Sequence, residues 1–541
     1  MKINCVFKSI VFSICYLYSQ PDSRFRPFDW VLYHGSGIIN SISEGYNYVY
    51  VGTENGGLKR FNTFSLNFDE PITMAQGLKS NKINAVHFDK EMGCLWAATP
   101  KFLNYSFSRE GNWFSISLES IGLSRYEKIK KIGSSIGHIW LKLNSSYIKL
   151  NHTNGSLIGT YSKPDELSID WSSGPVSFDA KIKKILLEFS FSEGWLFLDN
   201  SLIDKLGRKF DITTYFHARH GNIFLGLENG IFFYGTDVMQ IFNPINPDIN
   251  NFDISALGNF EDELFLGSID YINSKSITQI DTWNENKISF DFEETINMTP
   301  LPVYSINASK NELWVGGEDL MLFYDRKKDF WRTFGLETGM PSGKILDINV
   351  DSSYVWIATS SGLSRMSRKD KKNDLVGFEY LFSGMPVYQV KSQKNFLWIG
   401  AWSGIYLYSK LSPQLKNGME IGQRYFDQKI THVTAIKVSE DFVYIVGDLG
   451  IVKYDFESSV WDLILNAGVY KNKMVYSIDI NGNNIFIGTS DGITKINEKT
   501  GFVKEFNFPF LEQVNDIIII DNYLWAGTNS GLIKFKWKTS L

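Results

Sequence analysis

The sequence predicts an all-β fold built from one repeated unit, and three observations lead to that prediction. A short apolar segment that often carries tryptophan recurs along the chain, as in residues 524–527 (Leu-Trp-Ala-Gly) and 397–400 (Leu-Trp-Ile-Gly). A glycine-containing turn follows most copies, and Asp491-Gly492 is a typical hairpin turn. No stretch after the N-terminal segment shows the 3.6-residue period of an amphipathic helix.

The composition indicates large apolar cores and argues against nucleic acid as a partner. The 541 residues are 43% hydrophobic and 15% aromatic, which a disordered, solvating chain would not be. The formal net charge is −5, so the chain has no excess of positive charge with which to neutralise phosphates.

Residues 1–19 are predicted to be a secretory signal peptide. Lys2 and Lys8 precede an apolar run at residues 10–17, and polar residues follow, with cleavage expected after Ser19. The run is too short to span a membrane, and no later segment has about 18 consecutive apolar residues. We therefore expect a bacterial periplasmic or secreted protein without an integral membrane segment after signal removal.

Twelve copies of the unit are expected after the signal peptide. The small residue that ends the apolar segment serves as a marker, and successive markers are about 43 residues apart on average. Two of the markers, Lys142 and Ser190, are placed by spacing more than by sequence. The twelve markers are Gly52, Ala98, Lys142, Ser190, Gly226, Gly267, Gly316, Ala358, Gly400, Val446, Gly488 and Gly527.

Each unit is predicted to form four short strands. An alternating segment such as residues 345–348 comes first, and the tryptophan-bearing strand follows. A third strand ends in an aromatic residue and a carboxylate or amide, as at 323–325, and a fourth carries aromatics, as at 330–331. The second strand is apolar on both faces, so each sheet must be covered on both sides, and only other sheets are available. Such a unit is a β-propeller blade.

Twelve blades exceed the four to eight that normally close one ring, so tandem propellers are expected. The widest marker spacing lies between Gly267 and Gly316, which predicts a first propeller at 20–290 and a second at 291–541, six blades each. A split into seven plus five blades stays open. Residues 29–33 look like a fourth strand, and 532–535 like a third strand near the C-terminus. Residues 28–34 are therefore expected to complete the last blade of the second propeller.

The repeat resembles a known family, the two-component regulator propeller repeat of the ectodomains of bacterial hybrid sensor kinases. Residues 77–99 and 339–363 match its pattern of Gly-Leu-Pro-Ser-Asn, an alternating strand, and Leu-Trp-Ile-Gly-Thr-x-x-Gly-Leu. The resemblance implies paired propellers that respond to polysaccharide breakdown products. After Phe535 six residues remain, without the family's stalk, membrane helix or kinase. We therefore expect a stand-alone binding or sensing protein.

The sequence supports no catalytic residue, no metal ligand and no cofactor. Residues 488–492 match the Gly-x-Ser-x-Gly nucleophile elbow, but the same turn recurs elsewhere with Asn529 or Glu54 in place of the serine. His217 and His220 could be two metal ligands, but we expect no nearby Asp, Glu or Cys to complete a site and interpret the segment as a solvated turn. A propeller-fold polysaccharide-degrading enzyme is kept as the second alternative, because paired carboxylates can be judged only in three dimensions.

The ligand site is expected in the turns after the second strands, which lie with the blade connections on the face around the central channel. Trp402 is an aromatic where other units have small polar residues. Aromatic rings and carboxylates suit sugar C–H faces and hydroxyls, so a glycan fragment is the expected ligand. The alternative function is a protein-binding scaffold at the cell envelope. The alternative to any ligand site is that these residues lie in ordinary solvated turns. The candidate residues are Trp402, Asp270, Tyr271, Glu318, Asp319, Asp448 and Asp491.

Overall fold

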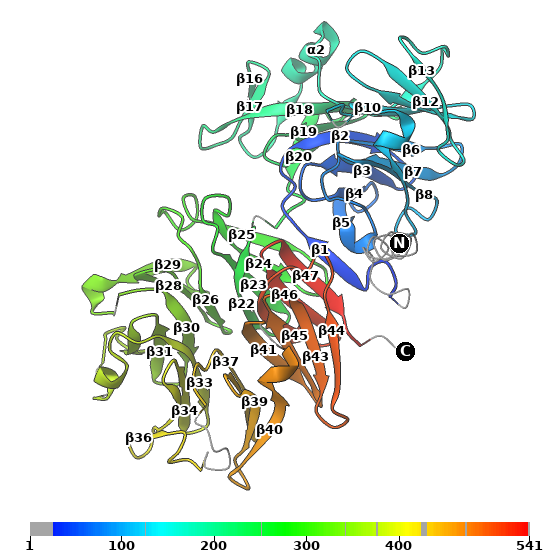
Figure 1. The fold of residues 1–541 in the computed structure, drawn as a ribbon. Coiled ribbons are helices and arrows are strands. Elements are labelled where there is room, and N and C mark those ends of the chain that lie inside the picture. Colours follow the sequence, from blue (N-terminus) through cyan, green and yellow to red (C-terminus); the bar gives the residue numbers. More distant parts are fainter. Residues whose placement is uncertain are drawn as a thin grey trace, which may run out of the picture. The chain divides into compact units, whose positions relative to one another are not determined.

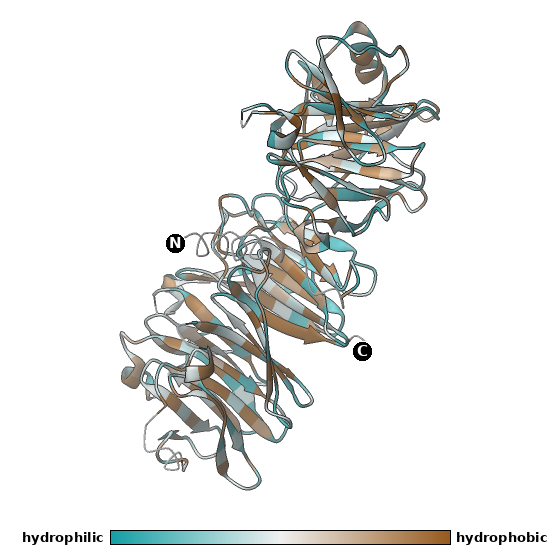
Figure 2. Ribbon diagram, turned by 45° about the vertical axis from the view of Figure 1, so that its right-hand side comes forward, coloured by the Kyte–Doolittle hydropathy of each residue, from teal (hydrophilic) through white to brown (hydrophobic). Residues whose placement is uncertain are grey.

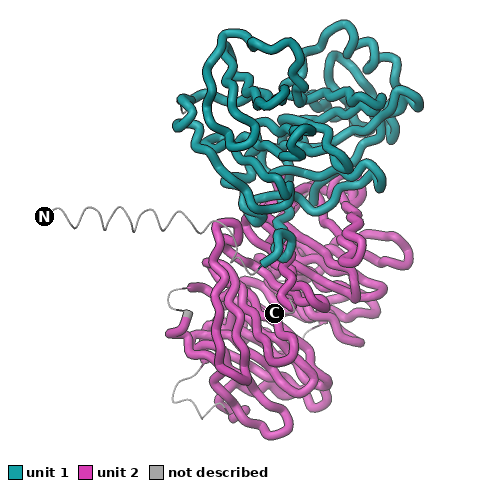
Figure 3. Tube along the Cα trace, turned by 90° about the vertical axis from the view of Figure 1, so that its right-hand side faces the viewer, with its two compact units in different colours: residues 1–249 teal, residues 250–541 magenta. Residues whose placement is uncertain are grey.

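The computed structural model describes residues 25–124, 126–249, 251–340, 342–374, 377–422, 430–470 and 473–538. The expected signal peptide, residues 1–19, lies outside these ranges. Contacts divide the chain into two compact units, residues 1–249 and 250–541 (Figure 3). Within the described ranges, no helix has the length and apolar character needed to cross a bilayer.

The described chain is almost entirely β, in agreement with the prediction. Its strands form eleven sheets, most of them four-stranded, and nearly all strand pairs are antiparallel (Figure 1). The pairing of β15 with β21 is parallel.

Unit 1 contains four sheets. The first two have the orders β2-β3-β4-β5 and β6-β7-β8-β9, the third has five strands, and the fourth has seven. Their strands are β2 (Ile39–Glu44), β3 (Tyr48–Thr53), β4 (Leu58–Asn62), β5 (Asn67–Ile72), β6 (Ala85–Asp89), β7 (Cys94–Ala98), β8 (Phe102–Ser106), β9 (Phe114–Ser117), β10 (Lys131–Ser135), β11 (His138–Lys142), β12 (Tyr147–Asn151), β13 (Leu157–Tyr161), β14 (Asp170–Trp171), β15 (Ser190–Phe191), β16 (Leu196–Leu198), β17 (Ser201–Ile203), β18 (Lys209–His217), β19 (Asn222–Leu227), β20 (Phe232–Thr236) and β21 (Ile241–Ile245). Its helices are η1 (Met74–Gln76), η2 (Leu118–Ile121) and α2 (Ala180–Glu188).

Unit 2 contains the other seven sheets, and within each of them the strands of this unit follow one another in chain order. These strands are β22 (Ile254–Phe260), β23 (Glu263–Ser268), β24 (Ser276–Asp281), β25 (Lys287–Asp291), β26 (Ser305–Ala308), β27 (Glu312–Gly316), β28 (Leu320–Asp325), β29 (Phe330–Gly335), β30 (Ile345–Val350), β31 (Tyr354–Thr359), β32 (Gly362–Ser367), β33 (Val387–Gln393), β34 (Phe396–Ala401), β35 (Gly404–Ser409), β36 (Gln414–Asn417), β37 (Ala435–Val438), β38 (Phe442–Gly447), β39 (Gly450–Asp455), β40 (Val460–Asn466), β41 (Val475–Asn481), β42 (Asn484–Thr489), β43 (Gly492–Asn497), β44 (Phe502–Phe506), β45 (Val514–Ile520), β46 (Tyr523–Thr528) and β47 (Gly531–Lys536). Its short helices are η3 (Leu336–Thr338), η4 (Glu379–Phe382) and η6 (Ala467–Tyr470).

The second strand of each sheet in unit 2 is buried on both faces, as its sequence predicts. In β31, β34 and β46 every residue after the first is buried. The tryptophans of these strands, Trp356, Trp398 and Trp525, are fully buried between sheets. Figure 2 shows hydrophobic residues, in brown, along many strands of the sheets. Face-to-face packing of sheets therefore forms the core of the unit.

The seven sheets of unit 2 close into a ring. Its first strands, β22, β26, β30, β33, β37, β41 and β45, pack against one another in that order, and β45 packs against β22. The closing contact includes a hydrogen bond from the Leu257 backbone N–H to the Asp516 carboxylate, 2.9 Å long. Unit 2 has the arrangement of a seven-bladed propeller.

The structure does not confirm twelve blades in two rings of six. The copy placed at Ser190 has no apolar second strand, because residues 180–188 form the helix α2 instead. The Asp179 side chain caps the start of this helix by accepting a hydrogen bond from the Ile182 backbone N–H. Leu186 and Phe189, with Ile182 and Ile185, pack into the core of unit 1. Their i, i+3, i+4, i+7 spacing is a helical pattern that the search for β repeats overlooked.

The boundary between the units also differs from the expected 290/291. Contacts place it at 249/250. The polar residues 284–286 form the turn between β24 and β25, and β25 is the fourth strand of the first sheet of unit 2. The wide spacing between Gly267 and Gly316 therefore lies inside a propeller.

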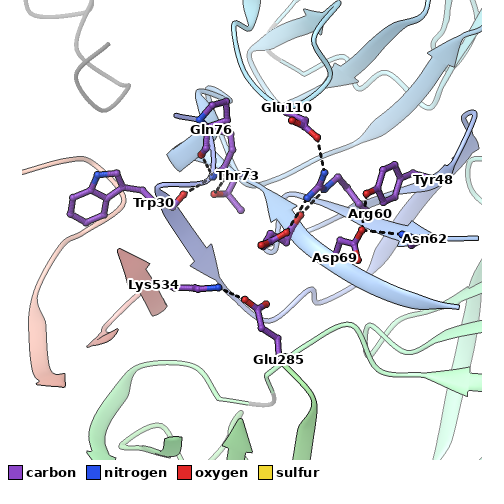
Figure 4. Close-up of polar contacts among 12 residues, drawn as sticks. Trp30, Tyr48, Arg60, Asn62, Asp69, Thr73, Gln76, Glu110, Glu285 and Lys534 are labelled. Carbon is purple, nitrogen blue, oxygen red and sulfur yellow. Dashed lines mark hydrogen bonds and ion pairs between the residues drawn. The ribbon is translucent and has the colours of Figure 1, made fainter. Parts of the chain in front are cut away.

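The strand β1 (Trp30–Tyr33) is the first strand of the described chain. All four of its residues are buried. The Gln76 side-chain amide donates to the Trp30 carbonyl at 2.7 Å, and Lys534 of β47 pairs with Glu285 (Figure 4).

Candidate functional site

Unit 2 contains a cavity of about 650 Å³ at the centre of its ring. Residues from all seven first strands, or from the loops that enter them, line it. A site that every blade helps to form is the usual place for a propeller ligand, and its volume falls within the ~300–1,000 Å³ of small-molecule pockets.

A backbone hydrogen bond fixes each of the seven turns after the second strands to an entry loop, which belongs to the same sheet in six cases and to the next sheet for Asp319. The backbone N–H of a turn residue donates to a carbonyl of an entry loop, for example from Trp402 to Pro386 at 3.1 Å. The other six donor–acceptor pairs are Ile269–Asp253, Asp319–Gly343, Ser360–Lys344, Asp448–Thr431, Ser490–Met474 and Asn529–Gln513. Because Ile269 and Asn529 also line the cavity, these turns lie around its opening.

Trp402 lies beside this opening, and two ring–ring contacts connect it to residues of the cavity wall. Its side chain is 54% exposed, and its ring packs edge-on against His432 with centroids 4.4 Å apart. The His432 ring lies 5.4 Å from the Tyr388 ring. His432 and Tyr388 line the cavity, whereas Trp402 does not. The three rings form an aromatic row from the turn into the cavity.

Three of the predicted carboxylates bind the protein's own loops. Asp319 accepts from the Gly343 backbone N–H at 2.5 Å. Asp448 accepts from both the backbone N–H and the hydroxyl of Thr431, at 2.7 and 2.5 Å. Asp491 accepts from Asn507 at 2.8 Å and lies 3.4 Å from the Lys473 ammonium. Holding these loops in place is therefore one role of these side chains.

The other predicted residues also lie on turns outside the cavity lining. Asp270 accepts from the Asn273 side chain at 2.7 Å, and Tyr271 is 46% exposed. Glu318 forms a backbone bridge with Lys344, whose ammonium lies 5.1 Å from the ring centre of Tyr304, a cavity residue.

The sequence analysis missed several ionisable residues in the cavity wall, namely Asp253, Asp347, Lys391, Lys437 and Asp516. The Lys391 ammonium lies 2.8 Å from the Asp347 carboxylate. Burial raises the pKa of Asp347, which the charge of Lys391 opposes. Burial raises the pKa of Asp516 to about 6, and the negative charge of Asp347 adds to that effect. Each aspartate is the third residue of its first strand and comes two residues after a β-branched residue, Ile345 or Val514. This shared position in the repeat could have identified both aspartates from the sequence.

The structure confirms that residues 488–492 form a hairpin turn. Thr489 pairs with Gly492 across β42 and β43, so the segment is strand–turn–strand rather than strand–turn–helix. The analysis of His217 was wrong in one respect, because Asp237 lies nearby, with Nε2 and Oδ2 3.0 Å apart. Asp237 lies in the turn after β20, and the pairing of β19 with β20 brings it back to His217.

Comparisons with known proteins were made at three levels. No family model matches the sequence, and no curated protein matches it. Among solved structures, the extracellular domain of the hybrid two-component system BT4673 from B. thetaiotaomicron is similar at 14% identity and a TM-score of 0.44, over 92% of this chain and 70% of that one. The corresponding domain of BT3049 from the same organism has 14% identity and a TM-score of 0.42, over 92% and 75%. The computationally designed protein Ika8 has 14% identity and a TM-score of 0.39, over 59% and 94%.

Proposed function

We propose that unit 2 binds an oligosaccharide or polysaccharide fragment at the opening of its central cavity, as a non-enzymatic binding or sensing protein of the periplasm or the cell exterior. The observation that carries the proposal is the aromatic row of Trp402, His432 and Tyr388. Aromatic faces offer apolar contact to the C–H faces of a sugar ring, and a concave site with a few polar groups orients it.

Polar side chains elsewhere in the cavity wall can bond to hydroxyl groups. Gln513, Asn515 and Asn529 line the same cavity. Amide side chains both donate and accept hydrogen bonds, which suits hydroxyls that also do both. The resemblance of the repeat to sensor ectodomains supports the same class of ligand.

The bonds that Asp347 and Asp516 make inside the protein favour binding over glycoside hydrolysis. Hydrolysis needs two carboxyl groups that flank the scissile bond, one as acid and one as base or nucleophile. Asp347 is paired with Lys391, and Asp516 accepts backbone N–H groups from Leu257 and Ile517. These two carboxylates are thus engaged within the protein wall, whereas Asp253, a third carboxylate of the cavity lining, has a pKa that burial raises.

A protein-binding scaffold is the second candidate, and one observation favours it. Trp402 and Tyr271 are both large aromatic side chains that are about half exposed on the turns of this ring. Exposed aromatics are common anchors of protein interfaces.

The test is calorimetric titration of the full chain with a panel of soluble oligosaccharides from plant and microbial polysaccharides. We expect saturable binding of at least one member, weakened by Trp402→Ala and unchanged by Trp283→Ala. Trp283 is a matched control because it is 77% exposed in the turn between β24 and β25, away from the turns after the second strands. A chain that binds no oligosaccharide but retains one envelope protein in a pull-down would support the scaffold instead. Release of reducing sugar would support the enzyme.

A further inference from the structure

Three potential metal ligands meet in unit 1, far in sequence from the candidate site. Asp89 ends β6, Glu91 lies in the turn after it, and His152 follows β12 in the next sheet. One ligand atom from each residue lies within 4.8 Å of the others. The His152 Nδ1 atom is 3.4 Å from Asp89 Oδ2 and 3.7 Å from Glu91 Oε2.

Two of these atoms are buried without a hydrogen-bond partner among the described residues, namely Asp89 Oδ2 and His152 Nδ1. Asp89 is fully buried, and its other oxygen accepts from the Glu91 backbone N–H at 3.0 Å. A buried carboxylate oxygen without a partner is costly, on the order of 1–3 kcal/mol or more. A charge-assisted hydrogen bond would be about 2.7–2.9 Å long, so 3.4 Å is too long for His152 to satisfy it fully.

The two separations from His152 Nδ1, 3.4 Å to Asp89 and 3.7 Å to Glu91, are close to the edge of a tetrahedral metal site. Zinc bonds to His nitrogen at about 2.0–2.1 Å and to carboxylate oxygen at about 2.0–2.2 Å, which sets ligand atoms roughly 3.4 Å apart. We propose that Asp89, Glu91 and His152 bind one divalent transition-metal ion, with Zn²⁺ as the best match. An imidazole favours zinc over magnesium or calcium, which prefer all-oxygen sites.

The surroundings suit a cation. Two carboxylates offset its charge, and the nearest lysine in sequence, Lys90, instead pairs with Glu44 at 2.9 Å. The Glu91 side chain is 49% exposed, which leaves a route for the ion and a position for water as the fourth ligand. The bound ion would join two neighbouring sheets of unit 1 and so stabilise them by mass action.

The test is titration of Zn²⁺ into the full chain after removal of metals with chelator. We expect one ion per chain by calorimetry and by elemental mass spectrometry, and a higher unfolding temperature of unit 1. His152→Gln and Glu91→Gln should each weaken binding at least tenfold. The matched control is His217→Gln, because the His217–Asp237 pair is 3.0 Å apart and needs no ion.

Any of three results would overturn the proposal. The first is absence of stoichiometric zinc binding in the unaltered chain. The second is a His152→Gln or Glu91→Gln variant that binds zinc as tightly as the unaltered chain, and the third is a His217→Gln variant that loses binding as strongly as these two. Glu91 is half-exposed, so Glu91→Gln is expected to fold even if His152→Gln does not, and circular dichroism would verify this.

Discussion

The Trp402 ring packs edge-on against the His432 ring, with their centroids 4.4 Å apart. This contact joins the turn after β34 to the entry loop of β37. Since more than half of the Trp402 side chain stays exposed, one face of the indole remains available while His432 fixes its position. A ring that is already held loses little conformational freedom when a ligand binds.

Trp402→Ala should therefore affect binding more than folding. We expect a loss of unfolding free energy of about 1 kcal/mol or less, because the lost contact is one edge-on ring pair at the surface. Binding of the oligosaccharide found in the panel should weaken about tenfold or more. Urea denaturation and calorimetry measure the two effects. A loss of about 3–5 kcal/mol, as for a buried tryptophan, would assign Trp402 to packing and remove it from the site.

The pH dependence of stability should carry the signature of Asp516. Its pKa is raised to about 6, so between about pH 4 and 6 the unfolded chain releases a proton that the folded chain keeps. This group therefore lowers the unfolding free energy as pH rises through that window, by at most about 3 kcal/mol, and has no further effect above it.

Asp516→Asn should abolish that contribution. Other carboxylates titrate in the same range, so the relevant quantity is the difference between variant and unaltered chain in urea midpoint, measured from about pH 4 to 7. We expect the variant to gain relative stability as pH rises. A difference that does not change with pH would show that the Asp516 carboxyl titrates as an ordinary exposed group.

Lys391→Met should destabilise unit 2 more strongly at pH 7 than at pH 5. Without the Lys391 ammonium, 2.8 Å away, the buried Asp347 carboxylate has no ionic partner and must be desolvated or protonated. Breaking a buried ion pair by removing one partner typically costs about 3–5 kcal/mol, and less here because Lys391 is partly exposed. The double variant Asp347→Asn/Lys391→Met should recover most of the loss. An equal loss at both pH values would show that packing of the lysine stem is responsible.

The sequence predicted the strand pattern well because burial on both faces leaves a clear mark. Trp356 and Trp398 occupy second strands in the structure as expected. The error at Ser190 arose because spacing alone was used where the apolar motif was absent, and α2 fills that interval. Where the repeat motif is absent, apolar residues alone do not distinguish a blade strand from a helix, because both bury such residues.

The candidate site was predictable only in part, because it depends on contacts distant in sequence. The position of Trp402 in a turn followed from the repeat. The hydrogen bonds between Asp448 and Thr431 could not be predicted, because the sequence of a turn does not show whether its carboxylate faces solvent or binds a neighbouring loop. The meeting of Asp89 with His152 was equally hidden, since the two residues belong to neighbouring sheets.

The last prediction concerns β1. The repeat pattern predicts that residues 28–34 complete the last blade of unit 2, so β47 would be left as an edge strand without β1. The backbone N–H and C=O groups on that edge of β47 would then have only water as a partner. Deleting residues 20–34 should therefore increase hydrogen exchange of β47 (Gly531–Lys536), while β31 (Tyr354–Thr359), in another sheet of unit 2, should keep its protection.

The matched control is Gln76→Ala. It removes the 2.7 Å hydrogen bond from the Gln76 amide to the Trp30 carbonyl but leaves the strand itself in the chain. We expect exchange to rise at β1 and η1 and to stay low at β47. Unchanged protection of β47 in the deletion variant would show that β1 does not stabilise this sheet. Increased exchange throughout unit 2 would instead mean that the whole ring depends on its last sheet, because each blade contacts only its neighbours and an open ring leaves two sheet faces uncovered.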